Sequence, residues 1–97
     1  MRKPLSEAEV LWRLPAIPGW EAEGNQRLVR KLAFRDHIEA MGFVTRLAIV
    51  AEVMDHHPDL RIVYNRVEVV LSTHDVGAVT DRDFDLAARV NGLLGQT

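Results

Sequence analysis

The clearest pattern along the chain is a broad apolar stripe between residues 36 and 55. From Phe34 onward, apolar residues recur at steps of three and four, namely Phe34, Ile38, Met41, Val44, Ala48 and Ala51. The stripe is widened by Phe43, Leu47, Val50 and Met54. This spacing predicts an amphipathic helix with a heavily buried face. The helix should end near His56, because Pro58 disfavours helical backbone in the residue before it. Gly42 weakens the helix interior, which close packing against another element would explain.

Two shorter helices are indicated by their start signals. Ser6 followed by Glu9 has the spacing of a capping box that opens a helix at about residues 6–14. Thr80 with Asp83 repeats this spacing. The residues that follow carry an apolar stripe of Leu86, Val90 and Leu93. The second box therefore predicts a final helix.

Four strands are predicted between these helices. Residues 20–22 and 26–34, separated by a turn at 23–25, favour a β-hairpin. Residues 60–73 are rich in β-branched side chains, and Asn65 splits them into two strands. The order helix-β-β-helix-β-β-helix predicts an α+β fold of two layers, a four-stranded antiparallel sheet with the helices on one face.

Composition limits the classes of function. The chain has 97 residues, a formal net charge of −2, 47% hydrophobic and 27% charged residues, and no cysteine. These values fit one globular domain spanning residues 1–97. No basic block supports nucleic-acid binding, and no apolar run approaches the roughly 20 residues of a membrane span. Because the basic start lacks the apolar segment of a signal peptide and cysteine is absent, we expect a cytoplasmic protein.

A pair of histidines stands out because of its position. His56 and His57 lie at the predicted C-terminus of the long helix, where the helix dipole and the free carbonyl groups favour a protonated imidazole. A histidine held there can act as a general acid near neutral pH. Glu52 is four residues before His56 and can share its helix face, and Asp55 is adjacent to the pair.

The residues alone leave three interpretations of this pair open. It can be a C-terminal cap before Pro58, an acid–base pair, or part of a metal site in which Glu52 and His56 are completed by His74. His74 follows the last strand and can line a cleft or lie on the surface, whereas His37 is interpreted as a surface or partly buried histidine. The sequence has no phosphate-binding loop and no nucleophilic serine motif, so proton transfer to a small ligand suits these residues best.

One spacing resembles a known family. The run Glu52-x-x-x-His56-His57-Pro58 is followed by five residues and Tyr64, nine residues and His74, and eight residues and Asp83. It is similar to the signature of the pterin-4a-carbinolamine dehydratases. Further similar segments are Gly19-Trp20, Met41-Gly42-Phe43-Val44, Tyr64-Asn65-Arg66-Val67, Leu71-Ser72-Thr73-His74 and Asp81-Arg82-Asp83. The resemblance covers about residues 5–94, and the predicted order of elements agrees with the family's fold.

The resemblance implies an activity. Such enzymes remove water from 4a-hydroxytetrahydropterins such as 4a-hydroxytetrahydrobiopterin, the products of aromatic amino acid hydroxylases, and so recycle the pterin cofactor as a quinonoid dihydropterin. The resemblance implies a hydro-lyase with no metal and no organic cofactor, assembled as a homodimer or homotetramer by pairing of sheet edges. The alternative is a non-catalytic pterin-binding or protein-interaction module, because animal members also serve as dimerisation cofactors of a homeodomain transcription factor.

The resemblance also assigns roles by position. His56 and His74 match the acid–base histidines near the 4a-hydroxyl, and His57 matches a histidine with a larger share in substrate binding. Glu52 and Asp55 match acidic positions that can orient the pair.

The remaining matched positions carry two readings each. Arg82 and Asp83 match the Arg-Asp of the family motif and either support the cleft or form a helix cap with a solvated arginine. Trp20 either packs in the core or an interface, or borders the site. One departure is Leu60, which stands close to where many members carry an aromatic residue. The change removes a stacking surface for a pterin and affects affinity or substrate range more than reaction type.

Overall fold

The order of elements is the one predicted. A computed structural model describes residues 3–95, so the expected domain of residues 1–97 extends at both ends beyond the described part. Its helices are α1 (Glu7–Arg13), α2 (His37–Met54) and α3 (Asp81–Leu93), with a short 3-10 helix η1 (Leu14–Ala16) after α1. Its strands are β1 (Glu21–Glu23), β2 (Arg27–Ala33), β3 (Asp59–Val63) and β4 (Arg66–Leu71). The prediction of an α+β fold is therefore confirmed.

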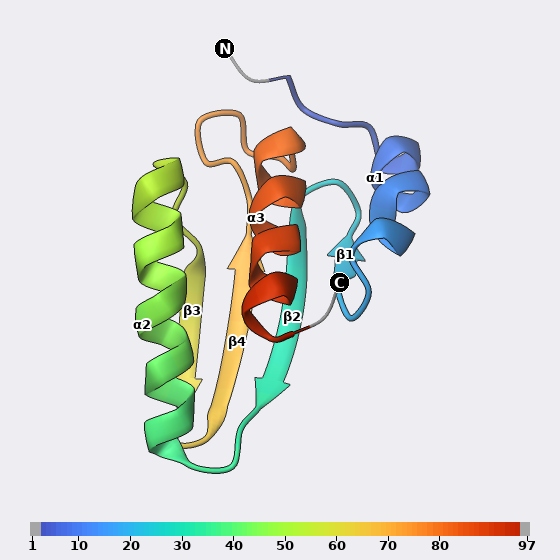
Figure 1. Ribbon diagram of the computed structural model, residues 1–97. Helices are drawn as coiled ribbons and strands as arrows, with labels where there is room; N and C mark the ends of the chain where they lie inside the picture. The colour runs from blue at the N-terminus through green and yellow to red at the C-terminus, as the bar shows by residue number, and fades with distance from the viewer. Residues whose placement is uncertain (1–2, 96–97) are drawn as a thin grey trace.

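The sheet is antiparallel throughout, with the strand order β1-β2-β4-β3. The first two strands form the expected hairpin, and the last two are joined by a turn at Tyr64 and Asn65. Asn65 donates a side-chain hydrogen bond of 2.8 Å to the carbonyl of Phe34, which ties this turn to the end of β2. Figure 1 shows α2 and α3 lying across the same face of the sheet. The C-terminal ends of α2 and β4 and the start of α3 therefore lie at the same end of the sheet (Figure 1).

The hydrophobic core fills the space between the sheet and the helices. The sheet contributes Leu28, Val67, Val69 and Leu71; α2 contributes Ala40, Phe43 and Leu47; α3 contributes Phe84, Leu86, Ala87 and Val90. All are buried or nearly so. Val67 and Val69 alternate along β4, so their side chains point to the same face of the sheet. There they pack against the helix side chains that recur every three or four residues.

The buried face of α2 differs from the expected stripe. Its buried residues are Ala40, Phe43, Leu47 and Ala51, whereas Ile38 is 82% exposed and Met41 is also exposed. The apolar residues of this helix spread over more of its circumference than one sheet can cover, so the sheet selects only one sector. The expectation that Ile38, Met41 and Ala48 lie on the buried face was wrong, since all three are exposed. In the described part of the chain, no helix is long and apolar enough to cross a membrane.

Gly42 is not explained by close packing, contrary to expectation. An added Cβ would meet only Nη1 of Arg46, at 3.5 Å, among the described residues. We therefore expect Gly42→Ala to raise the free energy of unfolding by about 0.5–1 kcal/mol, since alanine loses less backbone entropy in a helix. Urea unfolding measures the change. Gly77→Ala is the control: Gly77 has a φ of +65°, so the same side chain should destabilise there. An unchanged or lower midpoint for Gly42→Ala would contradict the prediction.

Both predicted capping boxes are present. Glu9 exchanges hydrogen bonds with Ser6, and these bonds hold the pKa of Glu9 below its ordinary value. Thr80 and Asp83 close the second box at the start of α3. The Thr80 box fixes where α3 begins. Asp83 is thereby placed at the end of the sheet where the candidate site lies.

Candidate active site

A hollow of about 280 Å³ lies where the end of α2, the end of β4 and the start of α3 come together. It is lined by Asp55, His56, His57, Ser72, Thr73, His74, Asp75 and Arg82. All eight are polar or ionisable, and they come from three separate elements or the turns beside them. The structure therefore brings together the three histidines that the sequence analysis selected.

A sharp turn after α2 sets the directions of the neighbouring histidines. The helix ends at Met54, and Asp55 adopts left-handed backbone with a φ of 51°. Aspartate tolerates this conformation better than most residues with a side chain. Because His56 lies beyond the helix, Glu52 contacts His57 instead, with 2.8 Å between Oε1 and Nε2. The expectation that Glu52 and His56 share a helix face was wrong.

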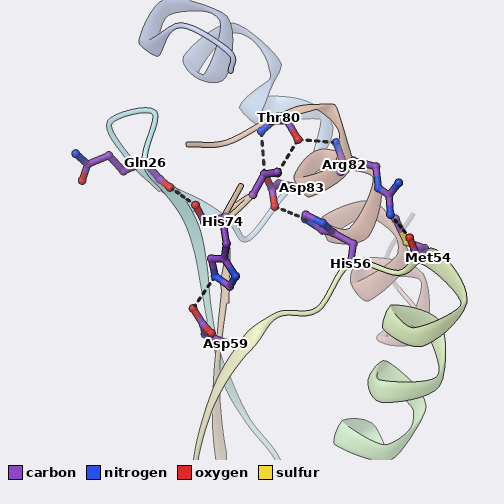
Figure 2. Close-up of polar contacts among 10 residues, drawn as sticks. Gln26, Met54, His56, Asp59, His74, Thr80, Arg82 and Asp83 are labelled. Carbon is purple, nitrogen blue, oxygen red and sulfur yellow. Dashed lines mark hydrogen bonds and ion pairs between the residues drawn. The ribbon is translucent and has the colours of Figure 1, made fainter. Parts of the chain in front are cut away.

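His56 is held by a buried carboxylate. Its Nε2 lies 2.6 Å from Oδ1 of Asp83, and the two side chains are 11% and 0% exposed. Oδ2 of Asp83 accepts hydrogen bonds from the Thr80 backbone N–H at 2.9 Å and from the Thr73 hydroxyl at 2.8 Å. Figure 2 shows Asp83 between Thr80 and His56. Asp83 therefore caps α3 and contacts His56 at the same time. The helix-cap reading is confirmed, and support of the cleft stays a prediction.

His74 has an acidic partner that the sequence analysis missed. Its Nε2 lies 3.5 Å from Oδ2 of Asp59, and both side chains are about two-thirds exposed. Figure 2 shows the two residues facing each other beside the strands. Asp59 begins β3, and the register pairs it with Val70 on β4, four residues before His74. The only available signal was this register, which the sequence does not specify.

All three histidines face a carboxylate through Nε2, by hydrogen bonds for His56 and His57 and by a longer contact of 3.5 Å for His74. Each presents Nε2 to a carboxylate, and the partners are Asp83, Glu52 and Asp59. A carboxylate oxygen accepts hydrogen bonds, so Nε2 carries a proton in His56 and His57, and Asp59 favours the same tautomer in His74. Nδ1 is then the nitrogen available to a ligand. When the ring is neutral, Nδ1 accepts a proton from the ligand, and when the ring is charged, Nδ1 donates one to it. The arrangement can therefore move protons in either direction.

Arg82 joins the two helices at the hollow. Its Nη2 donates a hydrogen bond to the carbonyl of Met54, the last residue of α2, and its side chain is half-buried. Its Nε is buried and has no hydrogen-bond partner within residues 3–95. Arg82 is therefore not a freely solvated side chain. It connects the turn that carries the histidine pair to the start of α3.

Other residues considered from the sequence lie away from the hollow. Trp20 is buried in the core, where its Nε1 donates to Oδ1 of Asn91 at 2.9 Å. Leu60 packs against the core, and Tyr64 is exposed at the turn between β3 and β4, at the other end of this hairpin from His74. His37 is exposed, which confirms the interpretation of a surface histidine. Its Nδ1 lies 2.7 Å from the Tyr64 carbonyl.

The metal interpretation is not supported by the geometry. Across residues 3–95, no three side chains of histidine, cysteine, aspartate or glutamate are placed to share a metal ion. Glu52 faces His57, His56 faces Asp83, and His74 faces Asp59. The proposed ligand set of Glu52, His56 and His74 is therefore not assembled.

Comparison with known proteins decides the family. The model of the family described as pterin 4 alpha carbinolamine dehydratase matches residues 3–93. The chain belongs to this family. A relative from Rhodopseudomonas palustris (strain HaA2) carries the provisional name pterin-4-alpha-carbinolamine dehydratase. It is 56% identical over 84 residues, which are 86% of this chain and 83% of that protein. A relative from Chloroflexus aggregans (strain MD-66 / DSM 9485) with the same provisional name is 45% identical over 91 residues, 94% of this chain and 97% of that protein.

Two solved structures of pterin dehydratase-like proteins share the fold. A transcriptional coactivator/pterin dehydratase from Brucella melitensis superposes with a TM-score of 0.88 and 37% identity, covering 94% of this chain and 98% of that one. A pterin dehydratase-like protein identified as a RuBisCO assembly factor in the alpha-carboxysome gives a TM-score of 0.69 and 25% identity, covering 81% and 93%. Proteins with this fold are therefore named for more than one role.

Proposed function

We propose that the chain is a 4a-hydroxytetrahydrobiopterin dehydratase, which removes water from a pterin-4a-carbinolamine. The observation that carries the proposal is the hollow at which His56, His57 and His74 meet, each with Nε2 turned to a carboxylate. Proton donors and acceptors of one type around one small cavity suit an elimination that needs both. The product, a quinonoid dihydropterin, would return to the cofactor cycle of aromatic amino acid hydroxylases.

The reaction needs two proton transfers. The bond between C4a and the hydroxyl oxygen breaks once that oxygen receives a proton, and water leaves. A ring nitrogen of the pterin gives up a proton, and its electron pair forms the new double bond of the quinonoid product. We assign these transfers to Nδ1 of His56 and Nδ1 of His74, and substrate binding to His57. One histidine begins charged and the other neutral, so each turnover exchanges their protonation states.

The surrounding residues support this assignment. Asp83 and Glu52 would hold His56 and His57 in one tautomer. Asp55 would supply the turn that separates the two rings, Arg82 would secure that turn to α3, and Pro58 would direct the chain into β3. These positions shape the hollow and do not need to touch the reacting atoms.

The purified protein should accelerate the dehydration of 4a-hydroxytetrahydrobiopterin above the uncatalysed rate. His56→Ala or His74→Ala should each lower the rate at least about tenfold, because general acid–base groups contribute roughly 10²–10⁴-fold. Stopped-flow absorbance of the quinonoid product measures it. His37→Ala is the matched control, since His37 is exposed at the start of α2, its Nδ1 lies 2.7 Å from the Tyr64 carbonyl, and it does not line the hollow. A wild-type rate equal to the background would contradict the enzyme assignment.

A second candidate is a non-catalytic pterin-binding or protein-interaction module. One observation favours it: the solved relative named as a RuBisCO assembly factor shares this fold. The rate measurement separates the two candidates. Saturable pterin binding without acceleration would support the module, whereas acceleration that depends on His56 and His74 supports the enzyme.

A further inference from the structure

The two acid–base candidates are paired with carboxylates in unlike ways. Asp83 is fully buried, and its contact with His56 belongs to a network that also includes Thr73 and Thr80. Asp59 is exposed, and its contact with His74 stands apart from that network. The Asp59 side chain therefore has no evident part in holding the fold, which leaves its position beside His74 to be explained by the site.

The backbone around each partner is fixed. Asp59 is the first residue of β3 and is held in register with Val70. On the other side, Thr73 donates its backbone N–H to Ala78 at 3.0 Å and accepts one from Gly77 at 2.9 Å, which closes the loop that carries His74. Only rotation of the two side chains remains, so the carboxylate and the ring need little reorganisation to meet.

The pair gains strength when a ligand fills the hollow. In the free protein both side chains are open to water, and an exposed ion pair contributes about 0–1 kcal/mol. A ligand seated against His74 expels water, and the lower local dielectric strengthens the attraction between carboxylate and ring. The effect of Asp59 therefore belongs to the bound complex and not to the stability of the fold.

We propose that Asp59 is a positioning residue that holds Nε2–H of His74, so that Nδ1 of His74 is the nitrogen that exchanges a proton with the substrate. The inference deepens the proposed dehydratase function and rests on it. Asp59 acts through His74 and does not contact the reacting atoms. The site thus contains two carboxylate–histidine pairs, one buried and one completed when the substrate covers it.

Kinetics test the positioning role. Asp59→Ala should lower kcat about five- to twentyfold, a fraction of the roughly 10²–10⁴-fold of a whole acid–base group, while KM and the thermal unfolding midpoint stay unchanged. Asp59→Glu should recover part of kcat. Glu68→Ala is the matched control, because it removes an acidic residue from β4 of the same hairpin, away from the hollow. An Asp59→Ala enzyme with wild-type kcat, or one that loses only stability, would overturn the proposal.

A measurement without turnover separates this proposal from the enzyme assignment. The ¹⁵N chemical shifts of the His74 ring show which nitrogen carries the proton when the ring is neutral. With a bound product analogue, wild-type protein should carry it on Nε2, and Asp59→Ala should carry it on Nδ1 in a larger share of molecules. Equal tautomer shares in the two proteins would overturn the role of Asp59 even in an active enzyme. An inactive wild type with the expected tautomer change would overturn only the dehydratase assignment.

Discussion

Asp83→Asn should lower the dehydration rate by roughly 10²–10⁴-fold, because a buried aspartate no longer holds the acid–base histidine in one tautomer. The wild-type carboxylate accepts from three donors: Nε2 of His56, the Thr73 hydroxyl and the Thr80 backbone N–H. An asparagine offers one oxygen and an NH₂ group that can only donate. Whichever way the amide turns, at least one of these donors loses its acceptor. If the oxygen stays with Thr80, the NH₂ group faces His56 and forces the opposite tautomer.

The same change should cost about 1–3 kcal/mol of stability, because a buried polar group is left unsatisfied. Rates are therefore compared well below the unfolding midpoint, with circular dichroism confirming the folded state. Asp85→Asn is the matched control, because Asp85 is an exposed aspartate two residues further along α3. It should leave rate and midpoint unchanged. A folded Asp83→Asn protein with a near wild-type rate would show that Asp83 is a helix cap only.

Phe43→Ala should lower the free energy of unfolding by about 3–5 kcal/mol, the range for a buried phenylalanine truncated to alanine. Phe43 is fully buried on α2, and its ring centroid lies 5.2 Å from that of Phe34. Truncation leaves a cavity between the helix and the sheet and removes the aromatic contact. Because domains of this size are stable by about 5–15 kcal/mol, one substitution removes a large share of the total.

Chemical unfolding followed by fluorescence measures the Phe43 effect. Ile49→Ala is the control, since Ile49 is an exposed apolar residue on the same helix. It should change the free energy of unfolding by less than about 0.5 kcal/mol, as exposed positions usually do. Equal losses for the two variants would contradict the assignment of Ile49 to the exposed face of α2.

The sequence predicted those features that short stretches of chain determine. The Ser6–Glu9 and Thr80–Asp83 boxes act over three residues, and both were found where expected. The β-branched residues of β4 alternate because successive side chains point to opposite faces. The histidines were recognised because His56, His57 and His74 stand at the ends of elements that were themselves well predicted.

The features that were missed depend on contacts between distant segments. Which sector of α2 is buried follows from how the sheet meets it, and the apolar spacing alone admitted the exposed Ile38. The partner of Glu52 follows from one left-handed residue, Asp55, whose backbone angle the sequence does not reveal. The Asp59–His74 contact joins residues fifteen positions apart through the register of a hairpin, which was not assigned.

Asp83 both caps α3 and contacts His56, and this has a consequence for comparing members of the family. A relative that had lost the chemistry would still need an acceptor at this position to begin α3, so its aspartate would persist for the sake of the helix. Asp59 and His74 carry no comparable structural duty, because both are exposed and neither closes an element. Substitution of this exposed pair, more than of the buried one, should mark the lineages in which the fold was inherited for another purpose.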